Sequence, residues 1–119
     1  MKMIIIREYN AIRNSMDSNL LSIGIYENKI IYNKEEITDI KKIEKIFKII
    51  EQYMEKIKTI SQKRVHNSKG GRQKMISITD EENKYFIVGN TEDVESKQLY
   101  ENIFKDVINT IEDSKNNIV

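Results

Sequence analysis

The chain contains no cysteine and no proline, and it has a single histidine, His66. Without cysteine, disulfide bonds, thiolate metal ligands, cysteine nucleophiles and dithiol redox chemistry are excluded. A zinc site needs three or four His, Cys or carboxylate ligands, so a single histidine does not indicate a zinc site. The absence of proline also leaves long helices without their strongest breaker.

Long hydrophobic runs and a strong net charge are missing as well. The N-terminus has only three consecutive isoleucines, Ile4 to Ile6, before the charged Arg7. A signal peptide needs an apolar core of about 7–15 residues and a transmembrane helix about 18 or more. We therefore expect a soluble, cytoplasmic protein without a membrane segment. The 20 Lys and Arg residues against 19 Asp and Glu residues give a formal charge of +1, too little to attract nucleic acid or membrane globally.

The 119 residues have the length of one ordinary domain. Hydrophobic residues make up 39% and charged residues 33% of the chain, a composition within the globular range. The apolar residues fall in periodic segments, which argues against intrinsic disorder. We expect a single domain over residues 1–113, followed by a frayed C-terminal tail over residues 114–119.

The first third of the chain has the composition of β-strands. Residues 1–9 are mostly β-branched or apolar with charges near the ends, which predicts a largely buried strand. Residues 10–19 are rich in Asn, Ser and Asp and predict a loop. Residues 20–26 then alternate with the period of a half-buried strand. Residues 30–37 predict its hairpin partner, with the turn about Asn28, because Asn tolerates a positive φ.

Two segments have helical periodicity. In residues 40–62, apolar side chains recur at steps of three and four, and Thr38 and Asp39 predict an N-cap hydroxyl followed by an acid in the first turn. A second helix near the C-terminus has Asn90 or Thr91 as its expected N-cap. Its apolar stripe consists of Leu99, Tyr100, Ile103, Phe104, Val107, Ile108 and Ile111.

A second hairpin lies between the helices. Residues 75–78 and 84–89 have strand composition and flank the polar turn segment 80–83. The order β-β-β-α-β-β-α predicts an α+β fold with a single antiparallel sheet and two amphipathic helices packed on one face.

The chain lacks the usual catalytic constellations. His66 stands beside glycines and cations without a carboxylate to orient it, so a catalytic triad is not indicated. Adjacent acids occur at Glu35-Glu36, Asp80 to Glu82 and Glu92-Asp93, but neighbours in a strand point to opposite faces and turn carboxylates usually face water. The glycines follow a helix and precede a strand, the reverse of a P-loop. We expect no enzyme activity, no metal and no cofactor; an enzyme using carboxylates and Tyr in an unfamiliar arrangement is the least favoured alternative.

The most distinctive segment is basic. Between Tyr53 and Met75 the chain carries seven Lys or Arg residues and one acid, Glu55, so this segment has a charge of +6 and the rest −5. Such a patch can bind phosphate or an acidic protein surface. The candidate anion- or partner-binding residues are Lys63, Arg64, His66, Lys69, Gly70, Gly71, Arg72 and Lys74. The alternative interpretation is a helix stop, with a glycine at the C′ position and Lys63 and Arg64 offsetting the helix dipole.

Tyrosines and the first helix offer two further surfaces. Tyr9, Tyr26, Tyr32 and Tyr85 fall on predicted strands and can share one sheet face, either as ordinary cover or as a partner-binding surface. The apolar stripe of the helix over residues 40–62 can pack on the sheet or mediate a homodimer.

These observations favour a small, non-enzymatic binding or inhibitory module that acts through protein–protein contacts. The element order and size resemble those of small cytosolic inhibitor and immunity-type proteins, a likeness of fold alone. The alternative hypothesis is nucleic-acid or nucleotide binding through the basic loop of residues 63–74.

Overall fold

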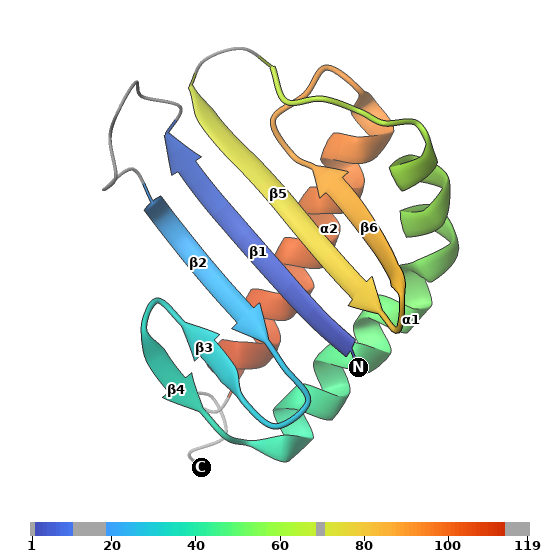
Figure 1. Ribbon diagram of the computed structural model, residues 1–119. Helices are drawn as coiled ribbons and strands as arrows, with labels where there is room; N and C mark the ends of the chain where they lie inside the picture. Colours follow the sequence, from blue (N-terminus) through green and yellow to red (C-terminus); the bar gives the residue numbers. More distant parts are fainter. Residues whose placement is uncertain (1, 11–18, 69–70, 114–119) are drawn as a thin grey trace.

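The structure, a computed structural model, describes residues 2–10, 19–68 and 71–113. Its elements in chain order are β1 (Lys2–Asn10), β2 (Asn19–Ile25), β3 (Ile30–Tyr32), β4 (Glu35–Ile37), α1 (Ile40–Gln62), β5 (Arg72–Asp80), β6 (Asn83–Val88) and α2 (Val94–Glu112). The strands form one antiparallel sheet in the order β4-β3-β2-β1-β5-β6. Both helices lie on the same face of this sheet (Figure 1), which confirms the predicted α+β fold.

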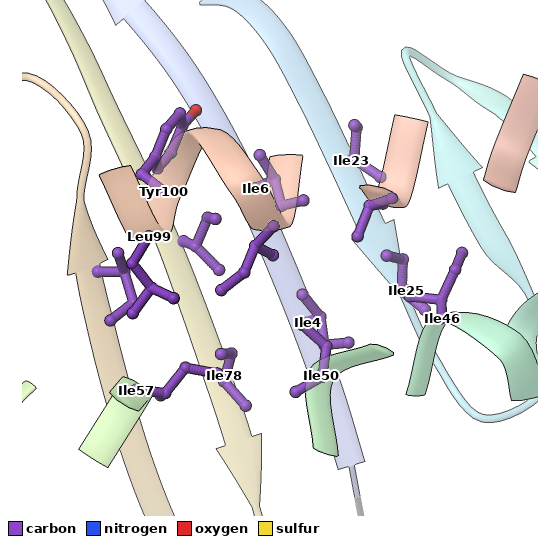
Figure 2. Close-up of a cluster of buried hydrophobic side chains, with 14 of the residues drawn as sticks. Ile4, Ile6, Ile23, Ile25, Ile46, Ile50, Ile57, Ile78, Leu99 and Tyr100 are labelled. Atoms are coloured by element: carbon purple, nitrogen blue, oxygen red, sulfur yellow. The ribbon is translucent and has the colours of Figure 1, made fainter. Parts of the chain in front are cut away.

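The hydrophobic core fills the space between the sheet and the helices (Figure 2). Alternate residues of the strands point into it; Ile6 of β1, for example, pairs with Ile23 of β2 and Ile76 of β5, and all three are fully buried. The helices contribute Ile43, Ile46, Ile50, Ile57, Ile60, Leu99, Tyr100, Ile103, Val107 and Ile111. Burial of each Ile side chain contributes about 1.5–3 kcal/mol, so this layer supplies much of the stability.

The segment predicted as a single strand over residues 30–37 is two strands. Asn33 and Lys34 both have positive φ, 47° and 78°, which is the requirement of a type I′ turn, so the chain reverses between β3 and β4. Asn33 also bonds twice to Ser22 of β2, donating its N–H at 2.9 Å and accepting at its side-chain oxygen at 3.0 Å. The element order is therefore β-β-β-β-α-β-β-α.

Both helices begin at an aspartate, later than the predicted caps. The Asp39 carboxylate accepts from the N–H groups of Lys41 and Lys42 at 3.1 and 3.3 Å, and the Thr38 hydroxyl does not cap α1. The Asp93 carboxylate caps α2, accepting from the N–H of Ser96 at 3.0 Å, so the prediction of Asn90 or Thr91 was wrong. A carboxylate at the N-cap accepts hydrogen bonds from the free amides and also interacts favourably with the helix dipole, which explains why aspartates cap both helices.

Polar contacts join α1 and α2 along their antiparallel length. Near the start of α1, the Lys42 ammonium donates to the carbonyl of Ile111 at the end of α2, at 2.5 Å. In the middle, the Tyr53 hydroxyl donates to the Asp106 carboxylate at 2.8 Å, and this hydrogen bond raises the pKa of Tyr53. Lys63 makes the third contact, beyond the end of α1. The helices are thus fixed to each other at both ends as well as through the core.

Candidate functional site

The face of the sheet opposite the helices carries several apolar side chains. Its central row takes one residue from each of five paired strands: Ile31, Gly24, Ile5, Ser77 and Phe86. On the same face, Met75 pairs with Val88 on one side of the row, and Met3 lies on the other side. We call this surface the open face, because no helix of the described chain covers it (Figure 1).

Exposure of the open face is greatest at its β6 edge. Phe86 has 46% of its surface exposed, whereas Ile5, Ile31 and Met75 are half-buried by their neighbours in the sheet. The small residues Gly24 and Ser77 separate the larger ones. A Cβ atom on Gly24 would come within 2.9 Å of the Tyr26 ring, so that ring folds over the glycine. The result is a shallow apolar surface on a rigid scaffold.

Tyrosines contribute less to this face than expected. Tyr26 covers Gly24, and Tyr9 lies under the Arg7 guanidinium, 5.2 Å from the ring centroid. Tyr32 and Tyr85 pair across strands with the core residues Ile23 and Ile78, so they lie on the helix-covered face of the sheet and pack against the core. The four tyrosines therefore do not share a face, because two have the strand parity of the core.

The prediction that a glycine stops the first helix was wrong. Lys63 is the C-cap of α1, and Arg64 follows in the left-handed region with φ 54°. The backbone N–H groups of these two residues donate to Ile60 and Ser61 at 3.1 and 3.3 Å, which satisfies carbonyls of the last turn. The helix thus ends at Gln62, nine residues before Gly71.

Lys63 is engaged in holding the helices together. Its ammonium lies 3.0 Å from the Glu95 carboxylate and 3.8 Å from that of Asp93 at the start of α2. The hydrogen bond to Glu95 is the main cause of a raised Lys63 pKa, followed by the nearby charges of both acids. Lys63 thus neutralises acids in this region, a structural role that the sequence analysis did not foresee.

The remaining candidate residues separate into two groups. Arg64 and His66 are exposed in the connection after α1, while Lys69 and Gly70 lie outside the described residues. Gly71, Arg72 and Lys74 line a pocket of about 350 Å³, which we call the basic pocket. Its other lining residues are Ser68, Gly89, Asn90, Thr91 and Lys97.

Five lining residues of the basic pocket are not among the candidates predicted from the sequence. Gly89, Asn90 and Thr91 form the connection between β6 and α2, and Lys97 lies in the first turns of α2. Ser68 stands inside the basic segment but carries no charge. The pairing of β5 with β6 brings these separate segments together, because the N–H of Gly89 donates to the carbonyl of Lys74 at 3.0 Å.

A larger groove of about 560 Å³ lies between the exposed sides of α1 and α2. Ile60 and Leu99 form its floor and Val94, which is 77% exposed, lies at its rim beside Glu55, Lys56 and Glu95. Its charges are mixed, and nothing in its lining selects a ligand class.

Comparison with known proteins does not assign the chain to a class. No family model matches it, and searches of curated proteins and of solved structures find no significant match. Among residues 2–10, 19–68 and 71–113, no three His, Asp or Glu side chains gather as a metal site requires. Neither α1 nor α2, the helices of this described part, is long and apolar enough to cross a bilayer.

The most strongly perturbed titratable group is the phenol of Tyr100. Its ring is fully buried and stacks on Phe104, with the centroids 5.9 Å apart, and its hydroxyl donates to Glu8 at 3.4 Å. Burial raises the Tyr100 pKa well above its ordinary value of 10, and the carboxylate of Glu8 raises it further. This tyrosine belongs to the core; it approaches Gly89 of the basic pocket, and its partner Glu8 lies 3.8 Å from the pocket residue Arg72.

We expect Tyr100 to destabilise the protein in alkali. Below pH 10 the phenol is protonated in both the folded and unfolded states, so its contribution is fully present there. Above pH 10 the unfolded chain releases the proton and the folded one does not, so this group lowers the free energy of unfolding by about 1.4 kcal/mol per pH unit. Urea unfolding at pH 8 and pH 11 should show a smaller alkaline loss for Tyr100→Phe than for the wild type. Equal losses in the two proteins would contradict the raised pKa.

Proposed function

We propose that this protein is a small, non-enzymatic binding or inhibitory module that docks a protein partner on the open face. The observation that carries the proposal is the central row with its exposed Phe86 and half-buried Ile5 and Ile31. The exposed face of an antiparallel sheet is commonly polar. An apolar one exposes surface that a partner can bury at a gain of about 25 cal/mol per Å².

The chemistry of the open face supports a protein as the partner. Interface cores are enriched in aromatic residues, Met and Arg, and Phe86, Met75, Met3 and Arg7 belong to this set. Two charges lie on the outer strands of the face, since Glu36 on β4 and Lys84 on β6 pair with residues of the same face, and Arg7 is the charge on its central strand β1. An apolar central row with one arginine beside it and charges on the outer strands suits a specific protein interface.

The edges of the sheet support binding through its face rather than by strand addition. The outer strand β6 has its Phe86 N–H occupied by the Ser61 hydroxyl of α1, at 3.1 Å. The other outer strand, β4, has only three residues. A long free edge, which strand addition requires, is therefore not offered by the described sheet.

A cross-linking experiment tests this proposal. A photoreactive phenylalanine analogue is placed at Phe86 and, as a control, at the exposed Lys105 of α2, and both proteins are irradiated in cells of the native host. We expect a defined partner adduct from position 86 and none from position 105. Phe86→Asp should abolish co-purification of the same partner, whereas Lys105→Glu should retain it. Retention by Phe86→Asp, or an adduct consisting of two copies of this chain, would contradict the proposal.

A further inference from the structure

The basic pocket is separate from the open face and has features of an anion site. Four segments contribute to it: the connection after α1, the start of β5, the β6–α2 connection and the first turns of α2. Its lining holds the three cations Arg72, Lys74 and Lys97, and none of the eight lining residues is acidic. Gly71, with φ 72°, has no heavy atom within 4 Å of where a Cβ would stand, which leaves its backbone open to close approach.

The walls of the basic pocket are fixed by hydrogen bonds. The N–H of Ser68 donates to the carbonyl of Asn90 at 2.7 Å, and the side-chain amide of Gln73 donates to the carbonyl of Ser68 at 3.1 Å. Gly89 is pressed against Lys74, since a Cβ on this glycine would lie 2.9 Å from that of Lys74. The pocket is thus preformed, so a ligand would not have to order these segments.

The positive charge of the basic pocket is only partly compensated. Asp93 and Glu95, the N-cap and the second residue of α2, are paired with Lys63. Arg72 has one carboxylate nearby, Glu8 at 3.8 Å, a distance too long for a good hydrogen bond. The ammonium groups of Lys74 and Lys97 have no hydrogen-bond or ion-pair partner in the described part of the chain. They are therefore available to a ligand.

We propose that the basic pocket binds the phosphate group of a small phosphorylated molecule. An arginine presents two parallel donors to phosphate and lysines add point charges, which together match a dianionic group. The hydroxyls of Ser68 and Thr91 are further donors of the kind that contact phosphate oxygens. The volume, about 350 Å³, falls in the range of small-ligand sites and exceeds the needs of a phosphate alone.

The lining also restricts the rest of the ligand. None of the eight described lining residues is aromatic, so the pocket has no surface on which a nucleobase could stack. Its uncharged side chains are hydroxyls and an amide. A phosphate monoester with a polar, non-aromatic carrier fits this chemistry better than a nucleotide does.

Isothermal titration calorimetry with glycerol 3-phosphate tests the inference, with inorganic phosphate, AMP and a mixed-sequence RNA as the other arms. We expect glycerol 3-phosphate to bind at least as tightly as AMP, and amide NMR signals of Gly71, Lys74 and Gly89 to shift. Lys97→Gln should weaken binding by about 10-fold to 100-fold, the effect of losing a charged hydrogen bond. The matched control, Lys105→Gln, lies on the exposed surface of the same helix and should leave binding unchanged.

Several results would overturn this inference. They are the absence of binding at millimolar glycerol 3-phosphate, equal effects of the two lysine variants, and binding of the RNA alone with a steep dependence on salt. Arg72→Gln provides a second variant, because Arg72 is exposed at the strand end and its loss should not prevent folding. Phe86→Asp should not change glycerol 3-phosphate binding, so this experiment and the cross-linking experiment fail independently.

Discussion

Replacing Ile6 by alanine is expected to lower the free energy of unfolding by about 2–5 kcal/mol. Ile6 is 0% exposed and lies in the central strand β1, flanked by Ile23 and Ile76 beneath the helices. Truncation removes the transfer free energy of its methyl and methylene groups and leaves a cavity that the rigid sheet cannot collapse to fill. Urea denaturation followed by circular dichroism measures the change.

Ile5→Ala is the matched control for this prediction. Ile5 is the adjacent residue of the same strand, but it points to the open face, between Gly24 and Ser77, and is half-buried. Its truncation should lower the free energy of unfolding by less than about 1.5 kcal/mol, because less buried apolar area is lost and no enclosed cavity forms. Equal costs at positions 5 and 6 would contradict the assignment of the two sheet faces.

Replacing Gly89 by alanine is expected to be the most damaging single-methyl addition. The new Cβ would lie 2.6 and 2.7 Å from two ring atoms of Tyr100 and 2.9 Å from the Cβ of Lys74. Neither neighbour can move easily, since Tyr100 is fully buried and Lys74 pairs with Glu8 in the β1–β5 ladder and accepts from the Gly89 N–H. Overpacking of this kind costs about 1–3 kcal/mol or more. The melting temperature and the urea midpoint should both fall.

Two further variants identify the cause of the Gly89 effect. In a Tyr100→Ala background, the cost of Gly89→Ala should shrink, because the ring that it meets is gone; a double-mutant cycle measures this coupling. In Gly71→Ala the new Cβ would meet no atom, so the free energy of unfolding should fall by only about 1 kcal/mol, because of the positive φ at this position. Additive effects of the Gly89 and Tyr100 changes would contradict the close approach.

Much of the fold can be predicted from the periodicity of the sequence, and the errors of that prediction have local causes. The first helix was predicted over residues 40–62 and occupies Ile40–Gln62, since no proline or glycine interrupts its apolar stripe. The break at Asn33 was missed because β3 and β4 have only three residues each, too few for a period to mark them as separate strands. Caps were misplaced by one to three residues, because several neighbouring polar side chains have similar capping tendencies.

The candidate sites could be predicted only in part. Sequence reasoning located Gly71, Arg72 and Lys74, because charge and glycine cluster there, but Lys97 joins them only through the folding of α2 against the sheet. Lys63 could not be told apart from the other basic residues, because its partners Asp93 and Glu95 lie thirty or more residues away in the sequence. Phe86 was not singled out, because all residues of the segment Tyr85 to Val88 are apolar, and alternation therefore does not reveal which side faces outward.

The strand order also determines where the chain can be interrupted. The strands β1 to β4 are neighbours in chain order and form one group, and β5 and β6 form a second group as a hairpin. The only pairing between these two groups of described strands is that of β1 with β5, a seam of nine residue pairs. In chain order each group is followed by one helix, but both helices pack against β6, so α1 crosses the seam. The connection after α1 joins the two halves, and the entropy of closing it grows only slowly with its length. A chain opened or lengthened at that connection keeps both half-sheets intact, and the seam together with the interhelical contacts remains to reunite them.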